Sequence, residues 1–220
     1  MILFKAKAVI FDMDGVITNT MPYHFRAWRK IFRQEGLDVT ECEIYLREGQ
    51  PGNITIKEIF KEHGLVFDEN RATLMLAQKE RLFKNTVRQD FIPGARPFLS
   101  SLKKNGFMLA LVTGTARHEA EHILPKGLLR IFDVTITGND VKKGKPHPEP
   151  YLLALKKLKL RPKEAIVIEN APFGIRSAKL AKIACIALET SLPKNYLKDA
   201  DLVFPSFRKL TKKVSFIRSR

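Results

Sequence analysis

The chain has 220 residues, of which 45% are hydrophobic and 28% charged, and its formal net charge is +16. This composition excludes global disorder and supports one sizeable domain, or a core with a smaller insertion. No apolar run approaches the roughly 18 residues that a helix needs to span a membrane. The apolar start of the chain runs into acidic residues without a small-residue cleavage site. We therefore expect a first strand there, no signal peptide and a cytoplasmic protein.

The first predicted strand is KAKAVIF, at residues 5–11, and two aspartates follow it directly. Asp12 and Asp14 stand two residues apart, with a glycine after them. Two like charges at the end of a buried strand are costly unless a cation, a proton or a substrate compensates them. The rest of the chain is expected to supply that compensation.

Residues 18–89 contain no convincing strand and are predicted to form several helices. The helical stretches are PYHFRAWRKIFRQEG, ECEIYLREG, NITIKEIFKEHG and DENRATLMLAQKERLFKN. Gly36, Gly49 and Gly64 are expected as helix stops. Pro93 and Gly94 mark a turn where the chain returns. We therefore predict a helical cap domain at residues 18–89, inserted into a core of residues 1–17 and 90–220.

Further along the chain, short apolar runs alternate with helical patterns. The predicted strands are FMLALVT, FDVTIT, AIVIE, IACIALE and DLVFPSF, and the predicted helices are ARPFLSSLKKN, ARHEAEHIL, EPYLLALKKLK and APFGIRSAKLAK. This alternation indicates an α/β fold whose parallel sheet is covered on both faces. Ligands of such sheets bind beyond the carboxyl ends of the strands. Asp12 and Asp14 would lie at that edge, with the helical segment above them as a lid.

The C-terminal stretch SFRKLTKKVSFIRSR carries six basic residues and no acids. Phe207, Leu210, Val214 and Ile217 recur in it at helical spacing, so we expect a terminal helix that packs through these side chains. The basic charge invites a nucleic-acid hypothesis, but no aromatic-interleaved basic motif or zinc-finger spacing is present. Nucleic-acid binding is therefore disfavoured, and the charge would at most steer anionic substrates. The two cysteines, at positions 42 and 185, are expected to be unpaired thiols.

Two further stretches are expected to place polar groups at the edge of the sheet that carries the aspartates. One strand ends on Thr113, Gly114 and Thr115, whose hydroxyl and main-chain N–H groups can donate hydrogen bonds to phosphate oxygens. Lys145 precedes Pro146 in a proline-rich segment that would hold it in place. Taken by itself, this lysine is also well explained as a surface charge.

A third stretch ends a strand on Glu169 and Asn170, whose oxygens suit a hard cation such as Mg²⁺, although loop capping would explain the pair equally well. A Mg²⁺ ion among Asp12, Asp14 and this pair would relieve the repulsion between the aspartates. Two like charges 4 Å apart cost about 1 kcal/mol in water and about 4 kcal/mol at an effective dielectric constant of 20. The lysine and the threonines would then hold the oxygens of a phosphoryl group.

These residues resemble the four motifs of the haloacid dehalogenase-like (HAD) superfamily of phosphoryl-transfer enzymes. The motifs stand in order as FDMDGV at residues 11–16, VTGT at 112–115, the lysine of GKP, and IEN at 168–170. The stretch DGVITNTMPYHFRAW is also similar to the β-phosphoglucomutase-like branch, whose members are mostly sugar-phosphate mutases and small-metabolite phosphatases. The resemblance covers essentially the whole chain, including the helical cap.

The resemblance implies a role for each motif residue. Asp12 would be the nucleophile that forms an aspartyl-phosphate, and Asp14 would protonate the leaving group and then deprotonate the incoming water or hydroxyl. Thr113 and Lys145 would hold the transferring phosphoryl group. The implied substrate contacts are Gly114, Thr115, His24, Lys79 and Gly49. The implied Mg²⁺ ligands are the Asp12 carboxylate, the Asp14 main-chain carbonyl, Glu169 and Asn170.

Some of these positions leave alternatives or depart from the pattern of the superfamily. His24 is equally well explained as a structural histidine on a helix face, and Lys79 as a solvated lysine. Asn170 stands where an aspartate is usual, which predicts weaker Mg²⁺ binding. Gly52 falls where the mutases carry an arginine for the distal phosphate, which favours a phosphatase. Lys182 replaces a glycine that commonly follows the helix before it, and a left-handed conformation at this lysine would cost up to about 1 kcal/mol.

We predict a Rossmann-like α/β core with an inserted helical cap. The predicted activity is a Mg²⁺-dependent phosphatase acting on a small phosphorylated metabolite, as a monomer or weak dimer. The first alternative is β-phosphoglucomutase or a related sugar-phosphate mutase. The second is a weakly active protein that binds an anionic partner through its basic surface. A dehalogenase is disfavoured because Asp14 would have no use in displacing a halide.

Overall fold

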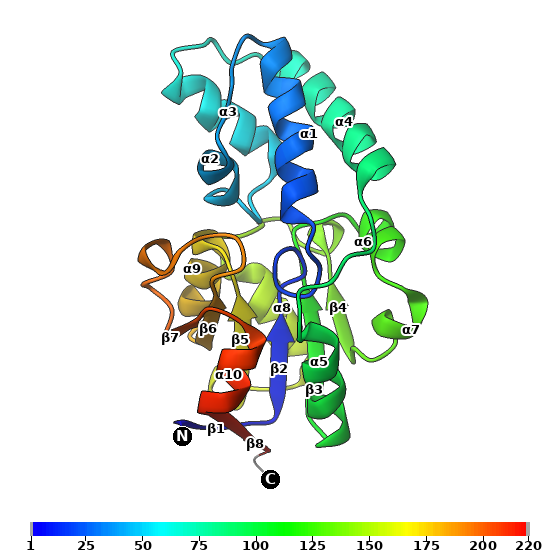
Figure 1. Cartoon of the computed structure of the whole chain (residues 1–220), viewed down its shortest axis with the longest axis vertical. Helices are drawn as coiled ribbons and strands as arrows, with labels where there is room; N and C mark the ends of the chain where they lie inside the picture. Colours follow the sequence, from blue (N-terminus) through cyan, green and yellow to red (C-terminus); the bar gives the residue numbers. More distant parts are fainter. Residues whose placement is uncertain (1, 219–220) are drawn as a thin grey trace.

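A six-stranded parallel sheet forms the centre of the molecule in a computed structural model that describes residues 2–218 (Figure 1). The strand order is β4-β3-β2-β5-β6-β7. In chain order the strands span Ala8–Phe11 (β2), Met108–Val112 (β3), Val134–Ile136 (β4), Ala165–Glu169 (β5), Ala184–Leu188 (β6) and Leu202–Phe204 (β7). β2 and β5 are buried along their whole length, as expected of strands that are covered on both faces.

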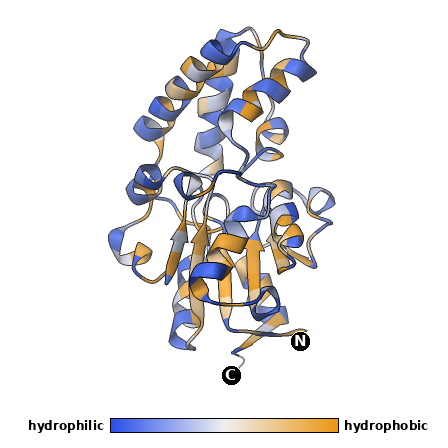
Figure 2. Cartoon of the chain, turned by 180° about the vertical axis from the view of Figure 1, so that it is seen from behind, coloured by the Kyte–Doolittle hydropathy of each residue, from blue (hydrophilic) through white to orange (hydrophobic). Residues whose placement is uncertain are grey.

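Helices cover both faces of this sheet, which confirms the predicted α/β fold. One hydrophobic cluster contains residues of α5 (Ala95–Lys104), α6 (Arg117–Ile123) and α10 (Phe207–Lys213), and the other contains residues of α8 (Glu149–Leu158) and α9 (Pro172–Leu180). The short connecting helices are α7 (Lys126–Leu129), η1 (Gly138–Asp140), η2 (Pro162–Glu164) and η3 (Lys194–Tyr196). Figure 2 shows the apolar strands enclosed by helices that carry both apolar and polar residues.

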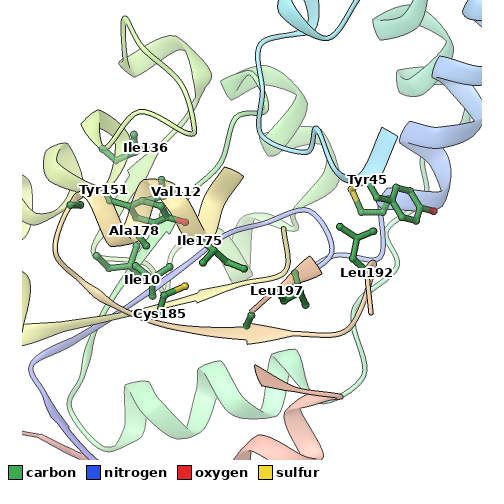
Figure 3. Close-up of a cluster of buried hydrophobic side chains, with 14 of the residues drawn as sticks. Ile10, Tyr45, Val112, Ile136, Tyr151, Ile175, Ala178, Cys185, Leu192 and Leu197 are labelled. Atoms are coloured by element: carbon green, nitrogen blue, oxygen red, sulfur yellow. The ribbon is translucent and has the colours of Figure 1, made fainter. Parts of the chain in front are cut away.

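Alternate side chains of the central strand enter different clusters, because successive strand side chains point to opposite faces. Val9 and Phe11 of β2 belong to one cluster and Ile10 to the other. Figure 3 shows the cluster of Ile10, which also contains Tyr151 and extends to Tyr45 and Leu192. This cluster therefore joins the sheet to the helices that follow β2.

Four helices lie between β2 and α5, where helical stretches were predicted: α1 (Met21–Gln34), α2 (Glu41–Tyr45), α3 (Gly52–Glu62) and α4 (Glu69–Thr86). Thr40 begins α2 with a reciprocal capping box to Glu43. Gly36 and Gly64 follow α1 and α3 with φ values of 77° and 71°, the left-handed conformation expected of helix stops. In Figure 1 the four helices stand beyond the carboxyl ends of the strands. The exact division of the chain into a cap and a core stays a prediction.

The two ends of the described chain differ from the prediction. Residues 2–11 form two strands, β1 (Ile2–Ala6) and β2, and α10 ends at Lys213 instead of continuing through Ile217. Val214–Arg218 form β8, which pairs in parallel with β1 in a separate two-stranded sheet. The segment VSFIR is rich in β-branched and aromatic residues, which favour a strand wherever a partner edge is available.

β2 is the point at which the sheet topology switches. Its neighbours are β3 on one side and β5 on the other. The chain runs from β2 through β3 to β4 in one half of the sheet and then crosses to β5 in the other half. Parallel sheets bind their ligands at such a switch point, outside the carboxyl ends of the strands. The residues that follow β2, β3 and β5 therefore meet at the edge of the sheet below α1–α4.

Two expectations from composition can be compared with the structure. Cys42 and Cys185 are both free thiols, as predicted. Within residues 2–218, no helix is both long and apolar enough to cross a membrane.

Candidate functional site

Asp12 follows β2 and forms a buried ion pair with Lys145. The ammonium Nζ of Lys145 lies 2.5 Å from Asp12 Oδ1 and also donates to Glu169 Oε1 at 2.7 Å and to the carbonyl of Val112 at 3.3 Å. Lys145 is only 2% exposed, so its interpretation as a surface charge is wrong. Burial by itself would lower the pKa of Lys145, but the carboxylates of Asp12 and Glu169 raise it above its ordinary value. The lysine thus supplies part of the compensating charge that the aspartates require.

The Asp12 carboxyl group keeps one oxygen without a partner. Burial raises the pKa of Asp12 above its ordinary value; Lys145 opposes this shift, and the charges of Glu169 and Asp14 add to it. Asp12 Oδ2 makes no hydrogen bond to any described residue. A buried carboxylate oxygen of this kind is costly unless a cation or a substrate reaches it.

Asp14 is held by hydroxyl groups and a histidine. Thr115 donates to Asp14 Oδ2 at 2.8 Å and Thr113 at 3.3 Å, while Thr20 donates to Oδ1. His24 Nε2 lies 3.5 Å from the same Oδ1. Burial would raise the pKa of Asp14, but these donors outweigh it and hold the pKa at about 2. The second aspartate is therefore compensated by hydrogen bonds, whereas the first is compensated by an ion pair.

His24 and Lys79 form a buried pair that links α1 to α4. Lys79 Nζ lies 3.0 Å from His24 Nδ1, and the imidazole stacks on Phe83 with ring centroids 3.9 Å apart. An ammonium group can only donate, so the His24 proton belongs on Nε2, which faces Asp14. Burial lowers the pKa of both Lys79 and His24. Lys79 is 7% exposed, so its interpretation as a solvated lysine is wrong.

Glu169 lies at the site but has no free oxygen. Oε1 accepts from Lys145 and from the hydroxyl of Tyr151 at 2.8 Å, and Oε2 accepts from the main-chain N–H groups of Asn170 and Ala171. The glutamate is thus already occupied by four donors. In this arrangement it holds Lys145 in place, and no contact among the described residues tests the metal-ligand role that the resemblance implied.

Asn170 and Glu48 each present an unpartnered oxygen at the same place. Asn170 Nδ2 donates to Glu48 Oε2 at 3.0 Å and to Ser191 Oγ at 2.9 Å. Asn170 Oδ1 and Glu48 Oε1 are buried and make no hydrogen bond to any described residue. Burial raises the pKa of Glu48 well above its ordinary value, and the nearby charges of Asp12 and Glu169 raise it further.

A hard cation fits this set of donors. Mg²⁺ prefers carboxylate and carbonyl oxygens, and Asp12, Asn170 and Glu48 each leave one such oxygen unpartnered. Within residues 2–218, no group of three or more His, Cys, Asp or Glu side chains is arranged to hold a metal ion. The amide oxygen of Asn170 and main-chain carbonyls would therefore have to complete the site. Sequence reasoning missed Glu48, whose only signal is an acidic side chain directly before a cap-loop glycine.

The loop that contains Gly49 and the loop that contains Gly114 approach each other through these glycines. A Cβ atom on Gly49, which has a φ of 80°, would lie 2.9 Å from Lys145 Cδ. A Cβ atom on Gly114 would lie 3.2 Å from the carbonyl oxygen of Gly49. Only side-chain-free residues allow this approach, and the predicted residues Gly49 and Gly114 are thereby brought together.

A cavity of about 260 Å³ lies between these loops and α1–α4. Its floor includes Asp12, Asp14, Gly114 and Thr115, and its upper wall includes His24, Lys79, Trp28, Leu76, Glu80 and Glu119. Lys145 and Thr113 lie beneath this lining rather than in it. Gly52 also lines the cavity, and a Cβ atom there would come within 2.4 Å of Leu76 Cδ1. The volume suits a small molecule.

Comparison with known proteins gives consistent matches over most of the chain. Residues 6–182 match the family model described as haloacid dehalogenase-like hydrolase. The phosphorylated carbohydrates phosphatase of Thermotoga maritima is 36% identical over 184 residues, which cover 80% of this chain and 82% of that protein. The validoxylamine A 7′-phosphate phosphatase of Streptomyces hygroscopicus subsp. limoneus is 32% identical over 200 residues, covering 90% and 92%. The crystal structure of β-phosphoglucomutase from Clostridium difficile superposes with a TM-score of 0.80 at 27% identity, covering 94% and 96%.

Proposed function

Because the chain belongs to the haloacid dehalogenase-like hydrolase family, we propose that it is a phosphatase that hydrolyses a small phosphomonoester, a sugar phosphate or similar metabolite. The observation that carries this proposal is the pair of buried aspartates, Asp12 and Asp14, on the floor of the cavity. Two relatives that are more than 30% identical are named as phosphatases of phosphorylated carbohydrates and of validoxylamine A 7′-phosphate.

In the proposed reaction, Asp12 attacks the phosphorus atom in line with the leaving oxygen. A bond forms between the Asp12 carboxylate and phosphorus while the bond to the leaving oxygen breaks. Because Asp14 is ionised in the free site, it must take up a proton with the substrate, and it then gives that proton to the leaving oxygen. Asp14 then takes a proton from a water molecule, which attacks the aspartyl-phosphate and releases inorganic phosphate.

The surrounding residues would support these steps without reacting. Lys145 compensates the charge of Asp12 and, through its bond to Glu169, is held beside it. The three threonines and His24 stabilise the ionised form of Asp14, the form that accepts a proton from water. Gly114 would offer its main-chain N–H to a phosphoryl oxygen, whereas the N–H of Thr115 already donates to Thr113 Oγ1 at 3.0 Å. The helices above the cavity would exclude bulk water.

Mg²⁺ is the proposed cofactor, and its donors would be Asp12, the main-chain carbonyl of Asp14, Asn170 and Glu48. When bound, it would offset the negative charge that these carboxylates and a phosphoryl group bring together. We include Glu48 because its Oε1 atom is buried and unpartnered beside Asn170. Glu169 is left out of the direct ligands because both its oxygens already accept hydrogen bonds.

β-Phosphoglucomutase activity is the second candidate. The chain is 27% identical to a mutase structure, and the contacts among Lys79, His24 and Asp14 could sense a bound sugar phosphate. Gly52 argues against this candidate, because no arginine reaches the cavity from there and Leu76 fills the adjoining space. The complete set of buried catalytic groups also argues against a protein that only binds an anionic partner. The cytoplasmic location and the monomeric or weakly dimeric state stay predictions.

Phosphate release from a panel of phosphomonoesters, with and without Mg²⁺, tests the proposal. Asp12→Asn is the matched control, since it removes the nucleophile while keeping the size of the side chain. We expect Mg²⁺-dependent release by the wild type and none by the variant. Conversion of β-glucose 1-phosphate to glucose 6-phosphate without release would identify a mutase instead. Release that persists in Asp12→Asn would contradict the aspartyl-phosphate route.

A further inference from the structure

The wall of the cavity contains a buried carboxyl group that the proposed mechanism does not use. Glu119 lies in α6 and lines the cavity, yet it is only 8% exposed. Its side-chain oxygens take part in no hydrogen bond or ion pair with any residue of the described range 2–218. Its oxygens are not fully covered by protein atoms, so they face the cavity and are free to accept hydrogen bonds from a ligand.

The cationic groups near Glu119 cannot readily receive a second anion. Among the described residues, the lysines and arginines that line the cavity are Lys79 and Arg47. Arg47 is turned toward acidic partners: it forms ion pairs with Glu62 and Glu58 and donates to the Glu43 carbonyl. Lys79 Nζ already contacts His24 Nδ1. Burial raises the pKa of Glu119, and the positive charge of Lys79 opposes that rise.

We propose that Glu119 is a specificity-determining residue of this site. It would accept hydrogen bonds from hydroxyl groups of the leaving alcohol and reject substrates whose leaving group carries a second negative charge. The substrate class would then be phosphomonoesters of uncharged, hydroxyl-bearing alcohols. This inference rests on the proposed phosphatase function. The inference goes beyond that function because it concerns recognition of the leaving alcohol, whereas the aspartates and the lysine below the cavity serve phosphoryl transfer.

Like charges brought together in a site that excludes water repel strongly, whereas a carboxylate facing a hydroxyl gains a hydrogen bond. Glycerol 3-phosphate and 3-phosphoglycerate form a suitable pair of probes, since they differ only in carrying a hydroxymethyl group or a carboxylate at the far end. The ratio of their kcat/KM values isolates the effect of that charge.

The test compares the wild type with Glu119→Gln at pH 8. We expect the wild type to favour glycerol 3-phosphate, and Glu119→Gln to lower the ratio of kcat/KM values by about tenfold or more. Glu119→Asp, which keeps the charge, should retain most of the preference. Glu121→Gln removes a charge from an exposed position of the same helix and should leave the ratio unchanged.

A binding measurement keeps this inference separate from the proposed function. Calorimetry on Asp12→Asn, with and without Glu119→Gln, measures the affinity for both probes whether or not the protein turns them over. Tighter binding of 3-phosphoglycerate only in the double variant would support the inference even if no phosphate were released. A ratio that Glu119→Gln leaves unchanged, an equal effect of Glu121→Gln, or no binding of either probe would overturn it.

Discussion

Replacing Tyr151 with phenylalanine removes one hydroxyl group from beneath the active site and nothing else. Tyr151 is fully buried, and its hydroxyl donates to Glu169 Oε1 at 2.8 Å (Figure 3 shows its place in the core). Burial and the charge of Glu169 raise the pKa of Tyr151 well above its ordinary value, so it remains a donor at all relevant pH values. The ring would keep its packing, including the Lys145 ammonium 5.3 Å from the ring centroid.

The expected loss of stability follows from this single contact. A hydrogen bond to a charged group contributes about 1.5–3 kcal/mol, and the remaining donor to Oε1, Lys145, cannot replace the hydroxyl in the space the ring leaves. For a chain of this size, 1 kcal/mol shifts Tm by roughly 2–4 °C, so Tyr151→Phe should lower Tm by about 3–12 °C. Urea denaturation gives the free energy of unfolding directly.

Tyr23→Phe is the matched control. The hydroxyl of Tyr23 makes no hydrogen bond to any residue within the described part of the chain. Its ring centroid lies 5.7 Å from Arg26 Cζ, and a phenylalanine ring would keep that contact. This control should change the free energy of unfolding by less than about 0.5 kcal/mol. If Tyr151→Phe were as mild as the control, the hydroxyl would not be a significant support of Glu169, and the account of this site would be wrong.

Three further predictions follow from individual contacts. Asn170→Asp adds a carboxylate at the proposed cation site and should tighten Mg²⁺ binding in calorimetry; an unchanged metal requirement would refute the role of the amide. Gly49→Ala should destabilise the protein by more than about 1 kcal/mol, because φ is 80° there and a Cβ atom would lie 2.9 Å from the side chain of the buried lysine. Gly127→Ala, with nothing within 4 Å, is its control, and equal melting temperatures of the two variants would contradict the prediction. Hydrogen bonds from the side chain and main chain of Arg161 lower the pKa of Glu164 to about 2. Glu164 is thus more acidic in the folded chain than its ordinary value of 4.5, so its contribution is present above that pH and is lost as pH falls toward 2. The Tm difference between the wild type and Glu164→Gln should shrink over that interval, and a constant difference would show that charge is not its source.

Much of the fold was predictable because its signals are local. Strands covered on both faces need continuous apolar segments, and β2, β3, β5 and β6 appear in the sequence as such segments. Glycines after helices mark left-handed positions, and Gly36 and Gly64 adopt them. Lys182 stands where a glycine is usual, and its φ of 59° is left-handed. The pairing of β1 with β8 was missed, because it depends on two segments from opposite ends of the chain meeting in space.

Some features of the site could also be predicted from local sequence, and others could not. The local pattern was enough to place Asp12, Asp14 and Asn170 at one edge of the sheet, since each follows a strand and parallel strands share that edge. The surroundings of these residues depend on long-range packing. Whether Glu48 and Glu119 face the cavity or solvent depends on how α1–α4 pack over the core, and the sequence contains no local signal for that packing. The orientation of the Glu169 side chain also depends on tertiary contacts. It points toward Lys145 and Tyr151 because a buried carboxylate needs hydrogen-bond donors.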